Sequence, residues 1–204
     1  MSKPTINTNT FALALIAMAS NFVGLTEASP NAKWEDTTTK ASEKDKSDLL
    51  VLEMGKVSGW TPGAAYCAAF DGAMVNLTLD KLGFKDAGEV FLKSWTAHCM
   101  TNVRKMESRG LLKPVTEPSV GALMLHRHGK TDSGHAGIVA SVDGTYPNRM
   151  LACIEGNTSK GSAGDQRQGD GIFLKARNVN KNGTLITQGF LPVEAILTLA
   201  GFQL

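Results

Sequence analysis

The sequence predicts an α+β protein in which N-terminal helices pack on a C-terminal antiparallel β-sheet of about five strands. The first half of the 204-residue chain places apolar residues at helical spacing. The second half changes to short β-rich runs separated by Gly, Asp and Asn turns. Neither an internal repeat nor a domain linker is visible. We therefore expect one domain over residues 11–204, preceded by a flexible N-terminus at 1–10.

The first predicted element is the apolar run FALALIAMAS, which begins at Phe11. As a core helix it would be capped by Thr10 and would continue to about Leu25. As a signal peptide it would follow Lys3 and end at the small-residue site at 17–19. We favour the helix, because a single positive charge is weak for a signal. In either case the run is too short to span a membrane.

The remaining helices are separated by polar loops. Residues 27–48 are charged and rich in Thr and Ser, which predicts a solvated surface excursion. Apolar periodicity predicts four further helices, and glycines that follow two of them are typical helix ends. These helices are expected at residues 47–57, 67–82, 88–108 and 192–200.

Five runs in the second half predict the strands of the sheet. Each is short, rich in β-branched or other apolar residues, and bounded by turn residues. Because the helices come first and the strands follow one another, we expect an antiparallel meander covered by the helices. The predicted strands are residues 120–128, 135–142, 150–156, 171–179 and 184–191.

The stretch GWTPGAAYCAAF (59–70) places a thiol where a Gly/Pro loop becomes a helix. Unpaired N–H groups and the dipole at a helix N-terminus favour a thiolate, so Cys67 is a candidate nucleophile. Cys99 and Cys153 lie in apolar stripes and are expected to be inert core thiols. Three cysteines without a CxxC pair predict neither a disulfide framework nor a zinc site, and indicate a reducing compartment.

A second set of polar residues lies on two neighbouring strands. His135 begins the run HAGIVASV, and Glu155 and Asn157 end the next run in IEGN. If these strands form a hairpin, the start of one lies opposite the end of the other. Either Glu155 or Asn157 then reaches the His135 ring. Both point to the same face if the strand stays regular as far as Asn157.

Taken together, YCAAF, GHAGIV and IEGNTS resemble the CHAP domain, the cysteine- and histidine-dependent amidohydrolase/peptidase family with a papain-like fold. Three further parts of the chain are similar to this family, the last of them to its phage-type members. They are FVGLTE (22–27), PSVGALML (118–125) and GDGIFLKAR (169–177). The resemblance covers about residues 11–191 and identifies 11–204 as a single CHAP-like catalytic domain.

The resemblance implies a peptidoglycan hydrolase, either an N-acetylmuramoyl-L-alanine amidase or a peptide endopeptidase, of a phage endolysin or virion-associated lysin. It implies that Cys67 is the nucleophile and His135 the base, with Glu155 and Asn157 supporting the imidazole. The alternative is a structural or adaptor component of a virion, or an amidase toxin, that retains the fold. Partners would be peptidoglycan and virion tail or other phage proteins.

The same interpretation predicts where the protein works. We expect it to be made in a host cytoplasm without a cleaved signal and to act at the bacterial cell wall or periplasm. A net charge of +2, with 21 basic and 19 acidic residues and no Lys/Arg run, argues against a nucleic-acid partner.

No metal or cofactor is expected. Several CHAP domains carry an Asp-rich calcium site before the cysteine, but KVSGWTPGAAY (56–66) contains no carboxylate. His126 and His128 point to one side of a strand with His135 nearby, yet no carboxylate or Cys stands at ligand spacing.

Three aromatic residues are candidates for binding a glycan-peptide substrate. They are Tyr66, Trp60 and Trp95, and Tyr66 is favoured because it is adjacent to Cys67. The competing interpretation is that all three pack in the core.

Overall fold

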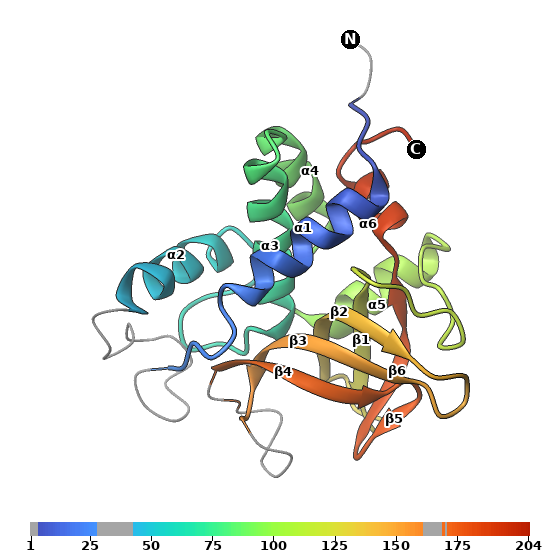
Figure 1. The fold of residues 1–204 in the computed structure, drawn as a ribbon. Helices are drawn as coiled ribbons and strands as arrows, with labels where there is room; N and C mark the ends of the chain where they lie inside the picture. Colours follow the sequence, from blue (N-terminus) through green and yellow to red (C-terminus); the bar gives the residue numbers. More distant parts are fainter. Residues whose placement is uncertain (1–3, 28–42, 161–168, 170) are drawn as a thin grey trace.

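The computed structural model describes residues 4–27, 43–160, 169 and 171–204, and it confirms the α+β class (Figure 1). The helices are α1 (Thr8–Ser20), α2 (Lys44–Met54), α3 (Cys67–Lys81), α4 (Lys85–Ser94), α5 (Cys99–Ser108) and α6 (Val193–Leu199). The strands are β1 (Leu123–His128), β2 (Gly134–Asp143), β3 (Met150–Thr158), β4 (Gly171–Asn178), β5 (Lys181–Asn182) and β6 (Leu185–Leu191). The five predicted strands are present as β1 to β4 and β6.

The strands form one antiparallel sheet in the order β4-β3-β2-β1-β6-β5. The edge strands β4 and β5 are joined by only Val179 and Asn180, so the sheet must curl until its two edges approach each other. Asn182 closes the curl, because its Nδ2 donates to the carbonyl of Asn178 at 2.8 Å and its Oδ1 accepts from the Asn178 N–H at 2.7 Å.

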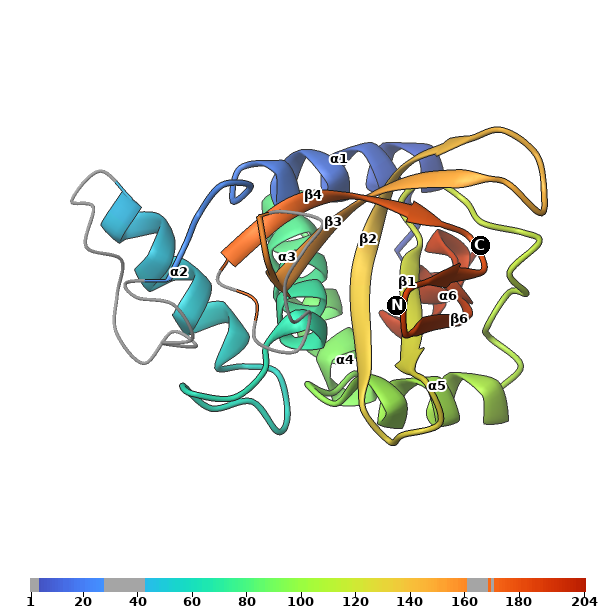
Figure 2. The same ribbon diagram turned by 90° about the horizontal axis from the view of Figure 1, so that it is seen from below.

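Both faces of the curled sheet are buried. The outer face packs against α1 and α3, and Figures 1 and 2 show these helices on one side of β2, β3 and β4. The inner face encloses a second apolar cluster made of Ala122, Met124, Val139, Leu151, Cys153, Val179 and Phe190. Because side chains alternate along a strand, His135, Glu155 and Arg177 also point to the inner face.

Helix α1 begins earlier and ends earlier than the sequence predicted. Asn7, rather than Thr10, caps the helix, because its Oδ1 accepts from the Thr10 N–H at 3.1 Å. Residues 8–10, expected in the flexible N-terminus, are therefore helical. The helix ends at Ser20, and the chain then turns instead of continuing as a helix to Leu25.

The surface excursion predicted over 27–48 is wrong for residues 44–48, which belong to helix α2. Residues 44–48 form its first turns, and the helix ends at Met54 rather than at 57. The part of the excursion at 28–42 lies outside the described residues. Among the helices that the structure describes, none is both long and apolar enough to cross a membrane.

The helix predicted over 88–108 is two helices, α4 and α5. Trp95 adopts an extended conformation (φ −108°, ψ 149°) and ends α4. The Asn102 side chain accepts from the Thr96 N–H at 2.9 Å and donates to the Thr96 carbonyl at 2.7 Å, and His98 then caps α5. These side chains satisfy backbone groups that a continuous helix would have paired, so local hydrogen bonds override the apolar periodicity.

The packing of α1 predicts a large difference between two leucines of that helix. Leu15 is fully buried in the main core, whereas Leu13 is 66% exposed. Leu15→Ala should reduce the free energy of unfolding by about 2–5 kcal/mol through lost burial and the cavity left behind. Leu13→Ala is the matched control and should change it by less than about 0.5 kcal/mol. Urea unfolding of the two variants measures the difference, and equal losses would contradict the core position of α1.

Candidate active site

Cys67 is the first residue of α3, as the sequence predicted. The first hydrogen bond of the helix runs from the Phe70 N–H to the Tyr66 carbonyl at 2.7 Å, so the N–H groups before Phe70 have no partner within the helix. The N–H groups of Ala68 and of Ala136 on β2 donate to the Cys67 sulfur. The thiol is 5% exposed. The backbone of both elements therefore favours a thiolate at this position.

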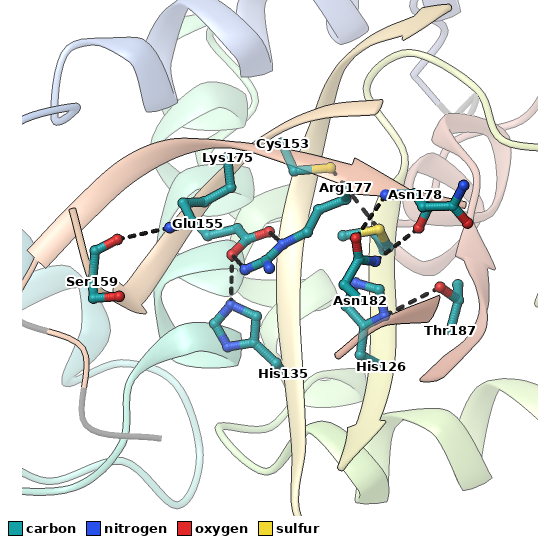
Figure 3. Close-up of polar contacts among 11 residues, drawn as sticks. His126, His135, Cys153, Glu155, Ser159, Lys175, Arg177, Asn178, Asn182 and Thr187 are labelled. Atoms are coloured by element: carbon teal, nitrogen blue, oxygen red, sulfur yellow. Dashed lines mark hydrogen bonds and ion pairs between the residues drawn. The ribbon is translucent and has the colours of Figure 1, made fainter. Parts of the chain in front are cut away.

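His135 and Glu155 are in direct contact, as the hairpin argument predicted. Strands β2 and β3 pair antiparallel, and Nε2 of His135 lies 2.8 Å from Oε2 of Glu155 (Figure 3). Both side chains are buried. With Nε2 bonded to Glu155, the other ring nitrogen of His135 is left for Cys67, whose interaction with the ring contributes to the raised pKa of His135.

Arg177 completes this cluster, and sequence reasoning missed it. Its Nε donates to Oε1 of Glu155 at 2.7 Å, and one terminal nitrogen donates to Oε2 at 2.5 Å (Figure 3). The guanidinium thus binds the carboxylate in a bidentate manner, through two parallel hydrogen bonds, which is the strongest form of this ion pair. The signal that could have identified Arg177 is that a buried Glu155 requires a cation beyond a titratable histidine.

The electrostatics of this cluster favour an ion pair between Cys67 and His135. Burial alone would lower the pKa of His135, but the Glu155 charge and hydrogen bonds to Cys67 and Glu155 outweigh it and raise the pKa to about 10. Burial would raise the pKa of Cys67, but the His135 contact and the N–H groups of Ala136 and Ala68 lower it. Despite burial, His135 and Arg177 lower the pKa of Glu155 to about 2.

Asn157 does not continue the regular strand, which corrects the prediction that it shares a face with Glu155 through period-2 alternation. The β3–β4 register shifts between Glu155 and Thr158, and Asn157 has a left-handed φ of 54°. Asn157 is buried close to the end of β3. The alternation rule fails here because it holds only for an unbroken ladder of paired residues.

Two glycines of the quoted motifs allow the site to form. A Cβ at Gly156 would lie 2.7 Å from the Cβ of Phe70, so only glycine lets β3 approach the first turn of α3 this closely. A Cβ at Gly137 would lie 2.6 Å from the Cγ of Glu155. Gly137 therefore leaves the space through which Glu155 reaches His135.

The three aromatic candidates pack in the core, in contrast to the substrate-contact role expected for them. Tyr66 and Trp95 have no exposed surface, and Trp60 has little. Trp95 stacks on Phe91, and its Nε1 donates to the Ala68 carbonyl at 2.7 Å. Trp95 thus braces the turn of α3 that carries Cys67. Side chains without exposed surface have no area to offer a substrate in this conformation.

The other two thiols and His126 lie next to the cluster. Cys99 and Cys153 are buried core thiols, as predicted, and the Cys99 thiol donates to the His135 carbonyl at 3.2 Å. His126 is paired across the strands with His135, and burial lowers its pKa to about 3. His126 Nδ1 contacts the hydroxyl of Thr187 at 3.2 Å. Within the described ranges, no three His, Cys, Asp or Glu side chains are grouped to hold a metal ion.

Asp71 is a further residue that the sequence analysis did not single out. It lies one helical turn after Cys67, it is fully buried, and neither carboxyl oxygen has a hydrogen-bond partner among the described residues. Burial raises its pKa well above the usual 3.8, and the charges of Cys67 and Glu155 raise it further. Both effects favour the protonated, neutral form of Asp71 in the folded protein.

Comparisons of the chain with protein-family models, curated proteins and solved structures found no match. The chemical interpretation of the site therefore depends on its own geometry: a thiol at a helix N-terminus, an imidazole in contact with it, and a carboxylate that orients the imidazole. This is the arrangement of an activated nucleophile, its base and the group that orients the base.

The neutral state of Asp71 predicts how stability depends on pH. A raised pKa gives stability that is complete below the usual value of 3.8 and is lost as the pH rises through the raised value. Asp71→Asn removes this loss, so the melting temperature of the variant minus that of the wild type should increase as the pH rises above the usual pKa of 3.8.

Asp80→Asn is the matched control, because Asp80 lies at the exposed end of the same helix. Thermal melts across the pH range measure all three proteins. If the difference for Asp71→Asn is flat with pH, or follows that of Asp80→Asn, Asp71 is not held in its protonated form.

Proposed function

We propose that this protein is a cysteine-dependent hydrolase that cleaves amide bonds in peptidoglycan. The observation that carries the proposal is the chain of contacts from Cys67 to His135 to Glu155 at the N-terminus of α3. A lowered thiol pKa beside an imidazole with a raised pKa is the electrostatic signature of a cysteine nucleophile.

In the first half of the reaction, the Cys67 thiolate attacks the carbonyl carbon of the amide. The carbonyl oxygen becomes an oxyanion, and the N–H groups of the first turn of α3, beginning with that of Cys67, are the donors closest to it. The His135 imidazolium then gives its proton to the leaving nitrogen as the C–N bond breaks. The products of this half are a free amine and a thioester on Cys67.

In the second half, water hydrolyses the thioester. Neutral His135 takes a proton from the water, which attacks the thioester carbonyl and releases a carboxylic acid and the Cys67 thiolate. Glu155 keeps the same ring nitrogen of His135 occupied throughout, so the other nitrogen stays directed toward the sulfur. Asn157, buried at the end of β3, is proposed as a support for this region of the cleft.

The substrate class and the papain-like CHAP fold rest on the resemblance of YCAAF, GHAGIV and IEGNTS together with the α+β arrangement. Within this proposal the protein is an amidase or endopeptidase of a phage lysin or virion enzyme and acts at the cell wall. Gly137 and Gly156, which belong to the second and third motifs, have steric roles at the cluster, and this supports treating the motifs as one functional set.

The proposal predicts that hydrolysis depends on the Cys67 thiol. Cys67→Ser should lose nearly all activity and keep its fold, because a serine hydroxyl in this geometry is a far poorer nucleophile. Purified sacculi digested with each protein and analysed by mass spectrometry measure the loss and also identify the bond that is cut.

Cys99→Ser is the control, because Cys99 is a core thiol whose hydrogen bonds to backbone carbonyls a hydroxyl can replace. It should digest sacculi at close to the wild-type rate. Solubilisation by Cys67→Ser at the wild-type rate would eliminate Cys67 as the nucleophile and favour a structural or adaptor role.

Catalysis is also expected to require the Glu155 charge and no metal. Glu155→Gln keeps the shape of the side chain but removes the charge that holds His135 as imidazolium, so the rate should fall by about 10²–10⁴-fold. Circular dichroism checks that the variant is folded, and digestion of sacculi gives the rate. EDTA should leave the wild-type rate unchanged. Loss of activity in EDTA with recovery in calcium or zinc would contradict this mechanism.

A further inference from the structure

We propose that Arg177 is a positioning residue that keeps the catalytic cluster electrically neutral and thereby allows Cys67 to exist as a thiolate. The inference deepens the proposed function, since it takes Cys67 as the nucleophile and assigns a role to a residue to which the resemblance gives none. Arg177 binds Glu155 through two hydrogen bonds, and its proposed effect on Cys67 is exerted through that carboxylate.

The geometry fixes Glu155 from two sides. Oε2 accepts one bond from His135 at 2.8 Å and one from Arg177 at 2.5 Å, while Oε1 accepts the second Arg177 bond at 2.7 Å. All of these groups are buried. Because a planar guanidinium fixes the plane of the carboxylate it binds, Arg177 determines where Oε2 meets the His135 ring.

The net charge of the cluster formed by Cys67, His135, Glu155 and Arg177 is the same before and after proton transfer from Cys67 to His135. With a thiol and a neutral imidazole, Glu155 and Arg177 sum to zero. With a thiolate and an imidazolium, the signs alternate along Cys67, His135, Glu155 and Arg177, and the sum is again zero. Proton transfer from Cys67 to His135 therefore creates no net buried charge, which would be costly to place in the protein interior.

Loss of Arg177 changes this balance. Either arrangement would then carry a net charge of −1 in the interior. Uptake of one proton restores neutrality, and the neutral form is a thiol beside an imidazolium held by Glu155. The cluster without Arg177 would therefore keep the proton on the Cys67 sulfur to a higher pH.

Other titratable groups face this cluster from the surrounding elements. Burial keeps Cys99 and Cys153 neutral through raised pKa values and His126 neutral through a lowered pKa. Burial also raises the pKa of Asp71, which favours its protonated form. Lys175 faces the same side of β4, but its Nζ donates to the Ser159 carbonyl at 2.9 Å (Figure 3). His128 lies two residues beyond His126 on the inner face of β1. Of these groups, Lys175 is the natural comparison for Arg177.

The test measures the thiolate without any cell-wall substrate. Iodoacetamide reacts with thiolates, so the alkylation rate of the Cys67-containing peptide, followed by mass spectrometry across pH, titrates this thiol. In Arg177→Met the profile should move to higher pH by about one unit or more, which makes alkylation about tenfold slower at neutral pH. Lys175→Met is the matched control and should shift the profile much less.

Arg177→Lys keeps the charge but offers Glu155 a single ammonium group, so its profile should lie between those of wild type and Arg177→Met. A wild-type profile in this variant would show that the charge at position 177 suffices and would overturn the positioning of Glu155 by the guanidinium, whereas the charge balance itself is tested by Arg177→Met. An unshifted profile in folded Arg177→Met, or an equal shift in Lys175→Met, would also overturn it. A shift in Arg177→Met without any sacculus digestion by the wild type would reject the proposed substrate and retain the role of Arg177.

Discussion

The Glu155 carboxylate has no exposed surface, and the rest of the site is arranged around the need to stabilise its buried charge. An ionised carboxylate is costly to bury unless its oxygens receive hydrogen bonds and its charge is matched. Three N–H donors supply this, one from His135 and two from Arg177. The two partners lie on β2 and β4, the strands on either side of β3. The strand order of the sheet is thus also the order of charges in the site.

The thiol reaches this charged cluster from the helical layer. Gly156 lets β3 pass close to Phe70 in the first turn of α3, and Trp95 holds that turn from the opposite part of the core through the Ala68 carbonyl. The sheet therefore supplies the imidazole, the carboxylate and the guanidinium, and the helix supplies the thiol and the N–H groups of its first turn. Neither layer forms the site alone, so its geometry depends on how tightly α3 and β3 pack.

The sequence predicted the positions of most elements, because apolar periodicity and turn residues are local signals. It also placed Cys67 at a helix start and His135 and Glu155 on paired strands. The break at Trp95 was missed, because it depends on the side-chain hydrogen bonds of Asn102, which no periodicity encodes. The irregular conformation of Asn157 was missed for a similar reason, since regular pairing was assumed as far as that residue.

Arg177 was missed because β4 buries its charged residues and exposes an apolar one, the reverse of the usual alternation in a strand. Leu174 is 57% exposed, whereas Lys175 and Arg177 point to the buried inner face. Alternation read from sequence assigns the apolar positions to the interior and the cations to solvent. Only the curl of the sheet, which encloses a polar interior next to Glu155, reverses that assignment.

Strand β4 lies at the edge of the sheet, where it pairs with β3. Its two ends are also held by a bridge between Gly171 and Thr26 and by the hydrogen bonds between Asn178 and Asn182. Edge strands open by local fluctuation more readily than central strands do. Each such opening of β4 withdraws Arg177 from Glu155 while β2, β3 and α3 still hold the other three groups together. If Cys67 is the nucleophile, such openings produce short-lived inactive forms with an intact core, and loss of activity on warming begins at β4 before global unfolding.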